Sequence, residues 1–191
     1  MKKIDKTLLI SITILSLFGL LMIYSSSNIW AEYKYNDPYK YLKSQSLFLI
    51  LGFIIIYIVS KINYQIYNKY SNKLLIISLI LLILVLIPGI GTIRNGSRSW
   101  FGIGSFGIQP SEFAKISLII FTAKYLSNNK IKNNKSTIIP IISVVFIFFG
   151  LIMLQPDFGT GVILVISIIA MLFVSGINLN FFIKAGIFGL I

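Results

Sequence analysis

The sequence of 191 residues contains no cysteine, no histidine and only five acidic residues. Without cysteine, the chain forms neither a disulfide framework nor a thiolate metal site. Without histidine, imidazole catalysis and histidine-ligated zinc are excluded as well. Any chemistry in this chain therefore rests on carboxylate, lysine, arginine and hydroxyl groups.

Charge of either sign is also scarce. Charged residues make up 12% of the chain and hydrophobic residues 57%, and the mean hydropathy is +0.91. A disordered chain would be far more polar, and an ordinary soluble domain with such long apolar runs would aggregate. The composition predicts an integral membrane protein.

The charges that are present are mostly basic: 17 lysine and arginine residues against five acidic ones give a formal net charge of +12. In a soluble protein this excess would suggest nucleic-acid binding. Here the lysines gather in short segments between apolar runs, which is typical of residues that set membrane topology and contact anionic headgroups. We therefore expect membrane lipids, and not nucleic acid, as partners.

Six apolar segments predict six complete transmembrane helices of an all-α polytopic membrane protein. They cover residues 7–24, 45–60, 74–87, 109–125, 138–154 and 161–174. The first exceeds the ~7–15 apolar residues of a signal peptide and is followed by a poor cleavage site, YSSSNIW. The run 74–87 is shorter than the ~20 residues that a bilayer needs, so it is expected to continue into flanking polar residues.

Polar segments connect these spans at residues 25–44, 61–73, 91–107 and 127–137, and a tight turn is expected at 155–160. Residues 181–191 begin a seventh span that stops after about half the length needed to cross. The chain is therefore interpreted as the N-terminal piece of a longer protein. We expect residues 1–191 to form a single membrane domain.

The basic residues also predict orientation, because lysine and arginine favour the cytoplasmic side. With a cytoplasmic N-terminus, the inner segments hold ten basic residues and the outer segments five. This orientation puts the loop 91–107 and the turn 155–160 together on the extracytoplasmic face.

Glu112 and Lys115 lie inside the predicted span 109–125, where a membrane helix usually carries no charge. With Gln109 they are spaced i, i+3 and i+6, along one side of a helix. Pro110 suits the first turn, so Glu112 falls near the positive helix N-terminus. Either the pair lines a cavity or substrate path, or the two side chains only pair with each other or reach to the interface.

Arg94 and Arg98 lie in a loop of glycine, serine and asparagine beside Trp100 and Phe101. Guanidinium groups next to exposed backbone N–H groups suit pyrophosphate oxygens. The alternative is contact with lipid headgroups and anchoring by aromatic rings at the interface. Residues 102–107 match GxGxxG, but they do not follow a strand in a βαβ unit, so a dinucleotide site is not expected.

Asp157 stands in QPDFGT at a helix entrance, where capping is one role for it. The segment repeats the pattern of Gln109, Pro110 and Glu112, in which a Gln-Pro pair is followed closely by an acid, at the same membrane face. A polar cavity is the other interpretation. Asp157 with Glu112 also allows a divalent-cation site, although two separated acids do not define one by themselves. No other cofactor is expected.

Three stretches carry a resemblance, in chain order GLLMIYSSS, NGSRSWFGIGSFGIQPSEFAK and QPDFGTGVILV. In this order and separation they resemble the SEDS family (shape, elongation, division and sporulation), which includes FtsW, RodA and SpoVE. YSSS and the phenylalanine of QPDFGT favour the division and sporulation branch. The resemblance covers nearly all of this chain but only about the N-terminal half of a family member.

The resemblance implies a bundle of ten helices in the bacterial plasma membrane that polymerises lipid II together with a class B penicillin-binding protein. The family's presumed catalytic aspartate lies in a later loop, so no catalytic residue is expected in this chain. Alternatives are a lipid II flippase and a non-catalytic scaffold of the division machinery. The residues expected to line the substrate cavity are Arg94, Ser97, Arg98, Trp100, Gln109, Ser111, Glu112, Lys115, Gln155, Asp157 and Thr160.

Overall fold

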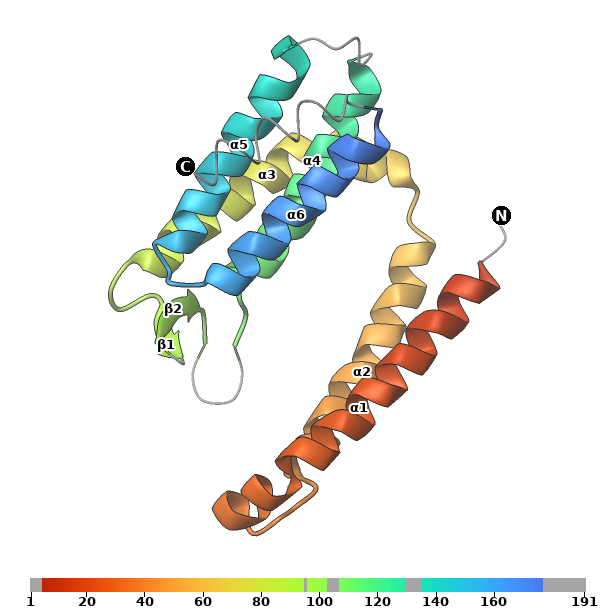
Figure 1. The fold of residues 1–191 in the computed structure, drawn as a ribbon, viewed down its shortest axis with the longest axis vertical. Coiled ribbons are helices and arrows are strands. Elements are labelled where there is room, and N and C mark those ends of the chain that lie inside the picture. The colour runs from red at the N-terminus through yellow and green to blue at the C-terminus, as the bar shows by residue number, and fades with distance from the viewer. Residues whose placement is uncertain (1–4, 95, 103–106, 130–134, 177–191) are drawn as a thin grey trace. The chain divides into compact units, whose positions relative to one another are not determined.

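The computed structural model describes residues 5–94, 96–102, 107–129 and 135–176. Within these ranges the chain forms six helices and one two-stranded hairpin (Figure 1). The helices are α1 Lys6–Tyr35, α2 Lys40–Ser60, α3 Tyr64–Leu86, α4 Pro110–Asn128, α5 Lys135–Met153 and α6 Phe158–Val174, and the strands are β1 Thr92–Arg94 and β2 Ser97–Trp100. The predicted helical membrane fold is thereby confirmed. The predicted seventh span, 181–191, lies outside the described residues.

The chain divides into two compact units, Met1–Asn63 and Tyr64–Ile191. In the first unit, α1 and α2 pack against each other as a hairpin of helices. In the second, α3 packs against α4, α4 against α6 and α5 against α6, with the two strands at one end (Figure 1). All of the predicted site residues belong to the second unit.

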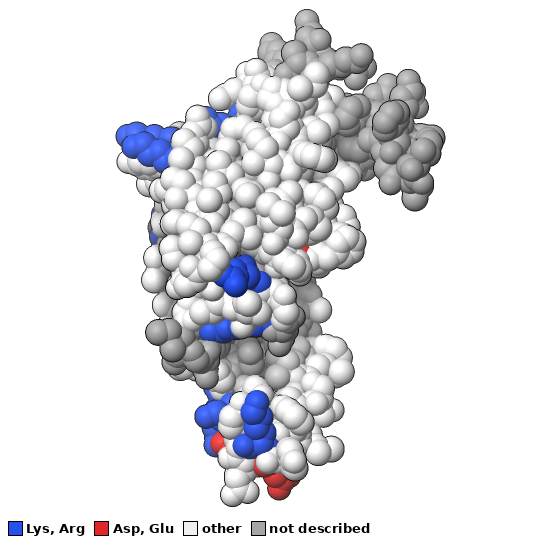
Figure 2. Space-filling model, turned by 90° about the vertical axis from the view of Figure 1, so that its left-hand side faces the viewer, with Lys and Arg blue, Asp and Glu red and all other residues white. Residues whose placement is uncertain are grey.

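The outer surface of the helices is apolar. Of the described helices, α1, α2 and α3 are long and apolar enough to cross a membrane, and α5 and α6 contain shorter apolar stretches. Large side chains such as Leu15, Phe146 and Ile166 are exposed by 70%, 74% and 59%. On the face drawn in Figure 2, lysine and arginine gather in small patches with uncharged surface between them. Hydrocarbon, not water, is the solvent that suits such a surface.

The helices extend further into polar sequence than predicted. α1 continues through Tyr35, so the loop predicted at residues 25–44 is wrong for most of its length. Ser26 and Ser27 do not end the helix because each hydroxyl donates to a backbone carbonyl one turn earlier, at 3.2 and 2.6 Å. The helix ends instead at Asn36, whose left-handed conformation (φ 55°) forms a C-terminal cap.

The same holds for α3, which begins at Tyr64. The loop predicted at 61–73 is therefore wrong over most of its length, while the expected extension of the run 74–87 into polar residues is confirmed. The turn before α6 is shorter than predicted, because α6 already begins at Phe158. Polar residues near a membrane interface keep the helical hydrogen-bond ladder, so hydropathy alone marks the bilayer and not the helix ends.

The core of the second unit lies where its four helices meet. Its fully buried large side chains are Leu82, Leu118, Ile141, Phe148, Ile152 and Leu164. Where α3 meets α4, Ser78 and Ser117 stand in place of large residues, and their hydroxyl oxygens lie 2.6 Å apart in a hydrogen bond. Small residues let membrane helices approach closely, and the bond satisfies both hydroxyls in apolar surroundings.

The segment 91–107 contains a β-hairpin where a polar, glycine-rich loop was predicted. β1 and β2 are antiparallel, with Arg94 opposite Ser97. Between them Gly96 adopts φ 83°, which glycine reaches without steric cost. After β2, Phe101 and Ile108 exchange two backbone hydrogen bonds of 2.8 Å, which fix the hairpin to the start of α4. Most of the GxGxxG match, residues 103–106, lies outside the described residues.

Candidate functional site

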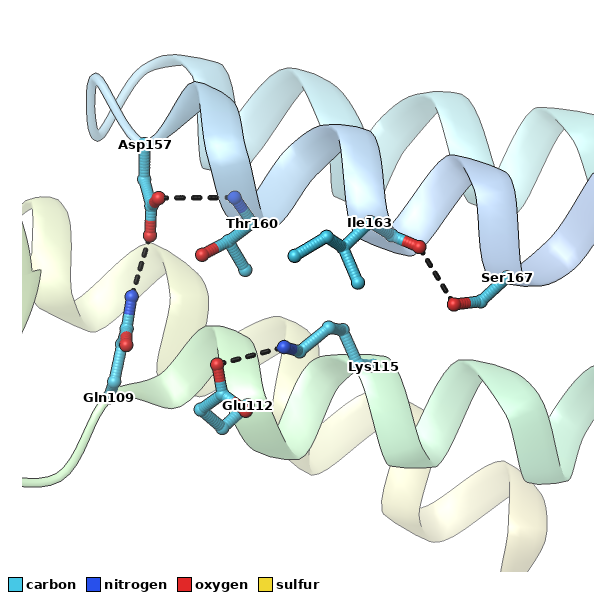
Figure 3. A network of polar contacts seen from close by, with 7 residues as sticks. All are labelled: Gln109, Glu112, Lys115, Asp157, Thr160, Ile163 and Ser167. Carbon is cyan, nitrogen blue, oxygen red and sulfur yellow. Dashed lines mark hydrogen bonds and ion pairs between the residues drawn. The ribbon is translucent and has the colours of Figure 1, made fainter. Parts of the chain in front are cut away.

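The predicted site residues meet at one end of the second unit. There α3 ends, the two strands lie, α4 begins and α5 turns into α6 (Figure 1). α4 and α6 start side by side and run in the same direction (Figure 3). Because a helix N-terminus carries partial positive charge, two such ends contribute to this region.

A hydrogen bond joins the starts of α4 and α6. Gln109 Nε2 donates to Asp157 Oδ2 at 2.6 Å (Figure 3). The other carboxylate oxygen, Oδ1, accepts from the backbone N–H of Thr160 at 3.3 Å and so caps α6. The capping role predicted for Asp157 is confirmed, and the same side chain also links two helices.

The sequence around Gln109 explains why it reaches the neighbouring helix. Gln109 precedes α4 but makes no side-chain cap bond to α4 itself. Pro110 occupies the first turn as predicted, since its missing N–H is not needed there. The glutamine amide is thereby available for Asp157, a contact between residues far apart in the sequence.

Glu112 and Lys115 form the ion pair that their spacing predicts, with Lys115 Nζ 2.8 Å from Glu112 Oε1. The Lys115 side chain is only 18% exposed, whereas that of Glu112 is 55% exposed. Figure 3 shows Lys115 on the side of α4 that faces α6, beside Thr160 and Ile163. Of the two charges, the ammonium is therefore the less exposed one, and the carboxylate offsets the cost of placing it between two helices.

Arg94, the last residue of β1, is oriented by its own loop. Its Cζ lies 5.0 Å from the centroid of the Trp100 ring, a cation–π contact. Gly107 lies so close that a Cβ at this position would come within 2.6 Å of Arg94 Nη1. Arg98 on β2 is half-buried. The hairpin thus holds two guanidinium groups at the end of the unit where α4 and α6 begin.

Ser97 and Gln155 connect the hairpin to the turn between α5 and α6. The Ser97 hydroxyl donates to the backbone carbonyl oxygen of Gln155. The Gln155 side chain is fully buried, and its Nε2 donates to the Leu82 carbonyl oxygen near the end of α3 at 3.4 Å. Its side chain presents no surface to a ligand, so its contribution is to hold α3, the hairpin and the turn together.

Ser111 is also fully buried, in the first turn of α4. Among the described residues its hydroxyl has no hydrogen-bond partner. Thr160 is half-buried and, in Figure 3, projects from α6 toward α4. Of these two predicted site residues, Thr160 is the one placed to meet a ligand between the helices.

The charges in this region favour an anionic ligand. Three cations, Arg94, Arg98 and Lys115, accompany two acids, Glu112 and Asp157. Both acids are already paired, Glu112 with the Lys115 ammonium and Asp157 with the Gln109 amide. The excess positive charge adds to that of the two helix N-termini, and both suit phosphate oxygens.

The possible divalent-cation site remains a prediction. Across the described ranges, no three acidic residues gather in a group that could hold a metal ion. Asp157 accepts two hydrogen bonds and Glu112 an ion pair, so each carboxylate has a partner from the protein itself.

Two contributors to the site were missed by the sequence analysis. Gly107 lies against the Arg94 guanidinium, where a larger residue would not fit without displacing it. The sequence signal for this close approach was a glycine that follows the two arginines in the same loop. The Leu82 carbonyl oxygen accepts from Gln155, but a backbone group leaves no mark in side-chain patterns.

Comparison with known proteins gives consistent matches along the chain. The model of the FtsW/RodA/SpoVE family, described as cell cycle protein, matches residues 5–191. Stage V sporulation protein E of Bacillus subtilis is 44% identical over 186 residues, which are 96% of this chain and 51% of that protein. The probable peptidoglycan glycosyltransferase FtsW of Saccharophagus degradans is 35% identical, over 98% of this chain and 49% of that protein.

Solved structures agree in fold. The crystal structure of the rod shape determining protein RodA of Thermus thermophilus superimposes with a TM-score of 0.68 at 28% identity, over 92% of this chain and 57% of that one. A chain from a structure titled "Structural coordination of polymerization and crosslinking by a peptidoglycan synthase complex" gives a TM-score of 0.71 at 27% identity, over 92% and 51%. The chain spans about half the length of the curated relatives it matches.

Proposed function

Because the chain belongs to the FtsW/RodA/SpoVE family, we propose that it forms the N-terminal part of a peptidoglycan glycosyltransferase that polymerises lipid II. The observation that carries this proposal is the bridge from Gln109 to Asp157, which aligns two helix N-termini beside a cluster of cations. Relatives named as probable peptidoglycan glycosyltransferases support the reaction class.

In this reaction the sugar 4-hydroxyl of one lipid II attacks the anomeric carbon of another, and undecaprenyl pyrophosphate leaves. A carboxylate from the part of the protein outside this chain would take the hydroxyl proton as the glycosidic bond forms. The role of this chain is electrostatic. Cations and helix N-termini stabilise the negative charge that develops on the departing pyrophosphate.

Individual residues divide into contacting and positioning groups. Arg94, Arg98 and Lys115 would contact phosphate oxygens, because guanidinium and ammonium groups form the strongest hydrogen bonds to them. Gln109 and Asp157 position the helix starts through the 2.6 Å bond. The contact of Arg94 with the Trp100 ring and the hydrogen bond from Ser97 to Gln155 position the hairpin.

The membrane arrangement follows from the distribution of lysines. Lys69 and Lys73 lie in the first half of α3 and Lys124 near the end of α4, away from the end that carries the candidate site. Since lysines favour the cytoplasmic side, the site faces outward and the N-terminus lies in the cytoplasm. A class B penicillin-binding protein is the proposed partner, supported by the likeness to a chain of a peptidoglycan synthase complex.

The test uses the intact protein that carries this sequence, purified in detergent with fluorescent lipid II. Lys115→Met should lower the polymerisation rate by about 10²–10³, the usual cost of losing one preorganised charge-stabilising group. Glu112→Gln should also lower the rate, because the Lys115 ammonium loses the carboxylate that holds it in place. Lys61→Met removes one positive charge from the other unit and should retain full activity.

Unchanged polymerisation by folded Lys115→Met and Glu112→Gln would contradict the proposed roles. Translocation of lipid II across vesicle membranes without any polymer would assign transport instead. Failure of both activities, together with normal assembly of the division machinery, would assign a scaffold.

A further inference from the structure

An apolar groove runs along the contact between α3 and α4 and is separate from the candidate site. Leu74, Ile77 and Leu81 line it from α3, and Phe113, Ile116 and Ile120 line it from α4. Its volume is about 110 Å³. Apolar cavities of ~150 Å³ with similar linings stay dry and bind small hydrocarbons, so a stretch of hydrocarbon chain fits here.

The floor of the groove explains why there is space for a ligand and why that ligand should be apolar. Ser78 and Ser117 are small, so they leave room between the isoleucines on either side. Their hydroxyls hydrogen bond to each other at 2.6 Å, and Ser117 is also 3.0 Å from the carbonyl oxygen of Ala114. The polar atoms of the floor are therefore paired, and what the groove offers to a ligand is an apolar surface.

One end of the groove is cationic. Lys124 lies one turn beyond Ile120 on the same side of α4, about 6 Å along the helix axis. On α3, Tyr70 lies one turn before Leu74, and the ammonium groups of Lys69 and Lys73 stand 5.6 and 5.7 Å from its ring centroid.

No acidic residue balances these lysines within the two helices. α3 contains none, and the acid of α4, Glu112, lies in its first turn at the opposite end. Lys124 makes one long contact, 3.4 Å to Asn72 Oδ1, which leaves most of its donor capacity for an anion.

We propose that this groove binds one acyl chain of an anionic glycerophospholipid, whose phosphate lies at Lys73 and Lys124. The apolar groove would hold the acyl chain, and the lysines at its end would contact the phosphate. These two parts follow each other in the protein as they do in a phospholipid. An anionic headgroup keeps its negative charge near the lysines, whereas a zwitterionic headgroup cancels it. The proposed phosphate position lies toward the end of α3 and α4 opposite Arg94 and Arg98, and the groove lies where α4 meets α3, so this inference does not rest on the proposed function.

The first experiment locates the chain. The protein is reconstituted in nanodiscs with phosphatidylglycerol that carries a photoreactive diazirine in its acyl chain, and crosslinked residues are mapped by mass spectrometry. We expect crosslinks to concentrate in residues 74–81 and 113–120. Ile77→Trp, which fills the groove, should remove most of them.

Ile76→Trp is the matched control. Ile76 neighbours Ile77 on the same helix and is equally exposed, 56% against 54%, but it does not line the groove. Crosslinks spread evenly around the helices, or equal effects of the two substitutions, would mean ordinary surrounding lipid and overturn the proposal. The same mapping on the intact protein must give the same segments, because loss of the crosslinks there would mean that protein covers the groove.

The second experiment tests the headgroup. Native mass spectrometry of the intact protein that carries this sequence, titrated with phosphatidylglycerol or phosphatidylcholine, gives a dissociation constant for each lipid. Lys73→Gln with Lys124→Gln should weaken phosphatidylglycerol binding by about five-fold per lysine. Lys40→Gln, which removes a basic residue of the other unit, is the control and should leave phosphatidylglycerol binding unchanged. Equal binding of the two lipids by the unaltered chain would refute the assignment of the phosphate.

Discussion

Gln109 Nε2 and Asp157 Oδ2 lie 2.6 Å apart although 48 positions separate the two residues in the chain. This contact ties the start of α4 to the start of α6, while the second carboxylate oxygen caps α6. The two roles of Asp157 can be separated by substitution.

Asp157→Ala should destabilise the protein more than Gln109→Ala. The alanine at 157 removes the helix cap, about 1 kcal/mol, as well as a hydrogen bond to a charged group, about 1.5–3 kcal/mol. The alanine at 109 removes only the second contribution. The measurement is the free energy of unfolding in mixed micelles as the fraction of denaturing detergent is raised.

A double-mutant cycle checks that the two residues act together, since contacting pairs show interaction energies of about 0.5–3 kcal/mol. Asp157→Asn keeps a good capping side chain, so it should lower the free energy of unfolding by less than Asp157→Ala does. Strictly additive effects of the two alanine substitutions would show that the bond contributes nothing to stability.

Gly107→Ala should displace the Arg94 guanidinium from the Trp100 ring. The added methyl group would lie 2.6–2.8 Å from three guanidinium atoms, closer than carbon and nitrogen approach without a bond. The arginine side chain is flexible, so it moves while the hairpin stays folded. We expect a change in Trp100 fluorescence, recorded in a Trp30→Phe background because the chain has two tryptophans.

Gly150→Ala provides the control, because a Cβ at this position meets no atom within 4 Å. An emission spectrum that shifts equally in both variants, or in neither, would argue against the contact between Arg94 and Trp100.

Ser97→Ala should loosen the hairpin from the turn that precedes α6. The substitution leaves the Gln155 carbonyl oxygen without its hydroxyl donor and costs about 1 kcal/mol. Amide hydrogen exchange should accelerate by about five-fold across residues 92–100, which corresponds to that free energy.

Ser143→Ala is the comparison, because the Ser143 hydroxyl donates only to the Ile139 carbonyl of its own helix. If hydrogen exchange in the hairpin stayed at the rate of the unaltered protein after Ser97→Ala, the bridge would not anchor it.

The turn between α1 and α2 predicts a pH dependence. Lys43 Nζ lies 2.8 Å from Asp37 Oδ2, and this hydrogen bond lowers the pKa of Asp37 below its ordinary value. Because the folded-state pKa is the lower one, the ionised carboxylate stabilises the turn above the unfolded pKa of ~3.9. That stabilisation is lost as the pH falls through the folded pKa.

Carboxyl carbon chemical shifts, measured on protein labelled at its three aspartates, report the titration. Asp37→Asn assigns the signal, and Lys43→Met should move the Asp37 midpoint upward. A midpoint that does not respond to Lys43→Met would exclude the ion pair as the cause.

The sequence predicted the six helices well because a bilayer imposes long apolar runs on any chain that crosses it. It did not predict their ends, since the serines after Tyr24 and the lysines before Leu74 remain compatible with the helical ladder. The hairpin was missed because its strands have only three and four residues. The dipeptide Asn95-Gly96, typical of two-residue hairpin turns, was the available signal.

The candidate site was predicted unevenly. Local features followed from spacing: the pair of Glu112 and Lys115, the proline in the first turn and the cap by Asp157. Contacts between distant segments did not, because the meeting of Gln109 with Asp157 depends on how α4 packs against α6. The burial of Gln155 could not be predicted either, since a polar side chain gives no sign of burial when its partner is a backbone carbonyl. For the buried Ser111, the structure shows no partner within the described residues that a pattern could have marked.

The parallel start of α4 and α6 has a consequence for ligand binding. Two like poles held side by side repel each other, and the Asp157 carboxylate between the two helix starts offsets part of this repulsion. An anion that binds between them would offset the remaining repulsion, so part of its affinity would come from the way the two helix starts are held together. Binding of a phosphate-bearing lipid should therefore raise the melting temperature as well as occupy the site.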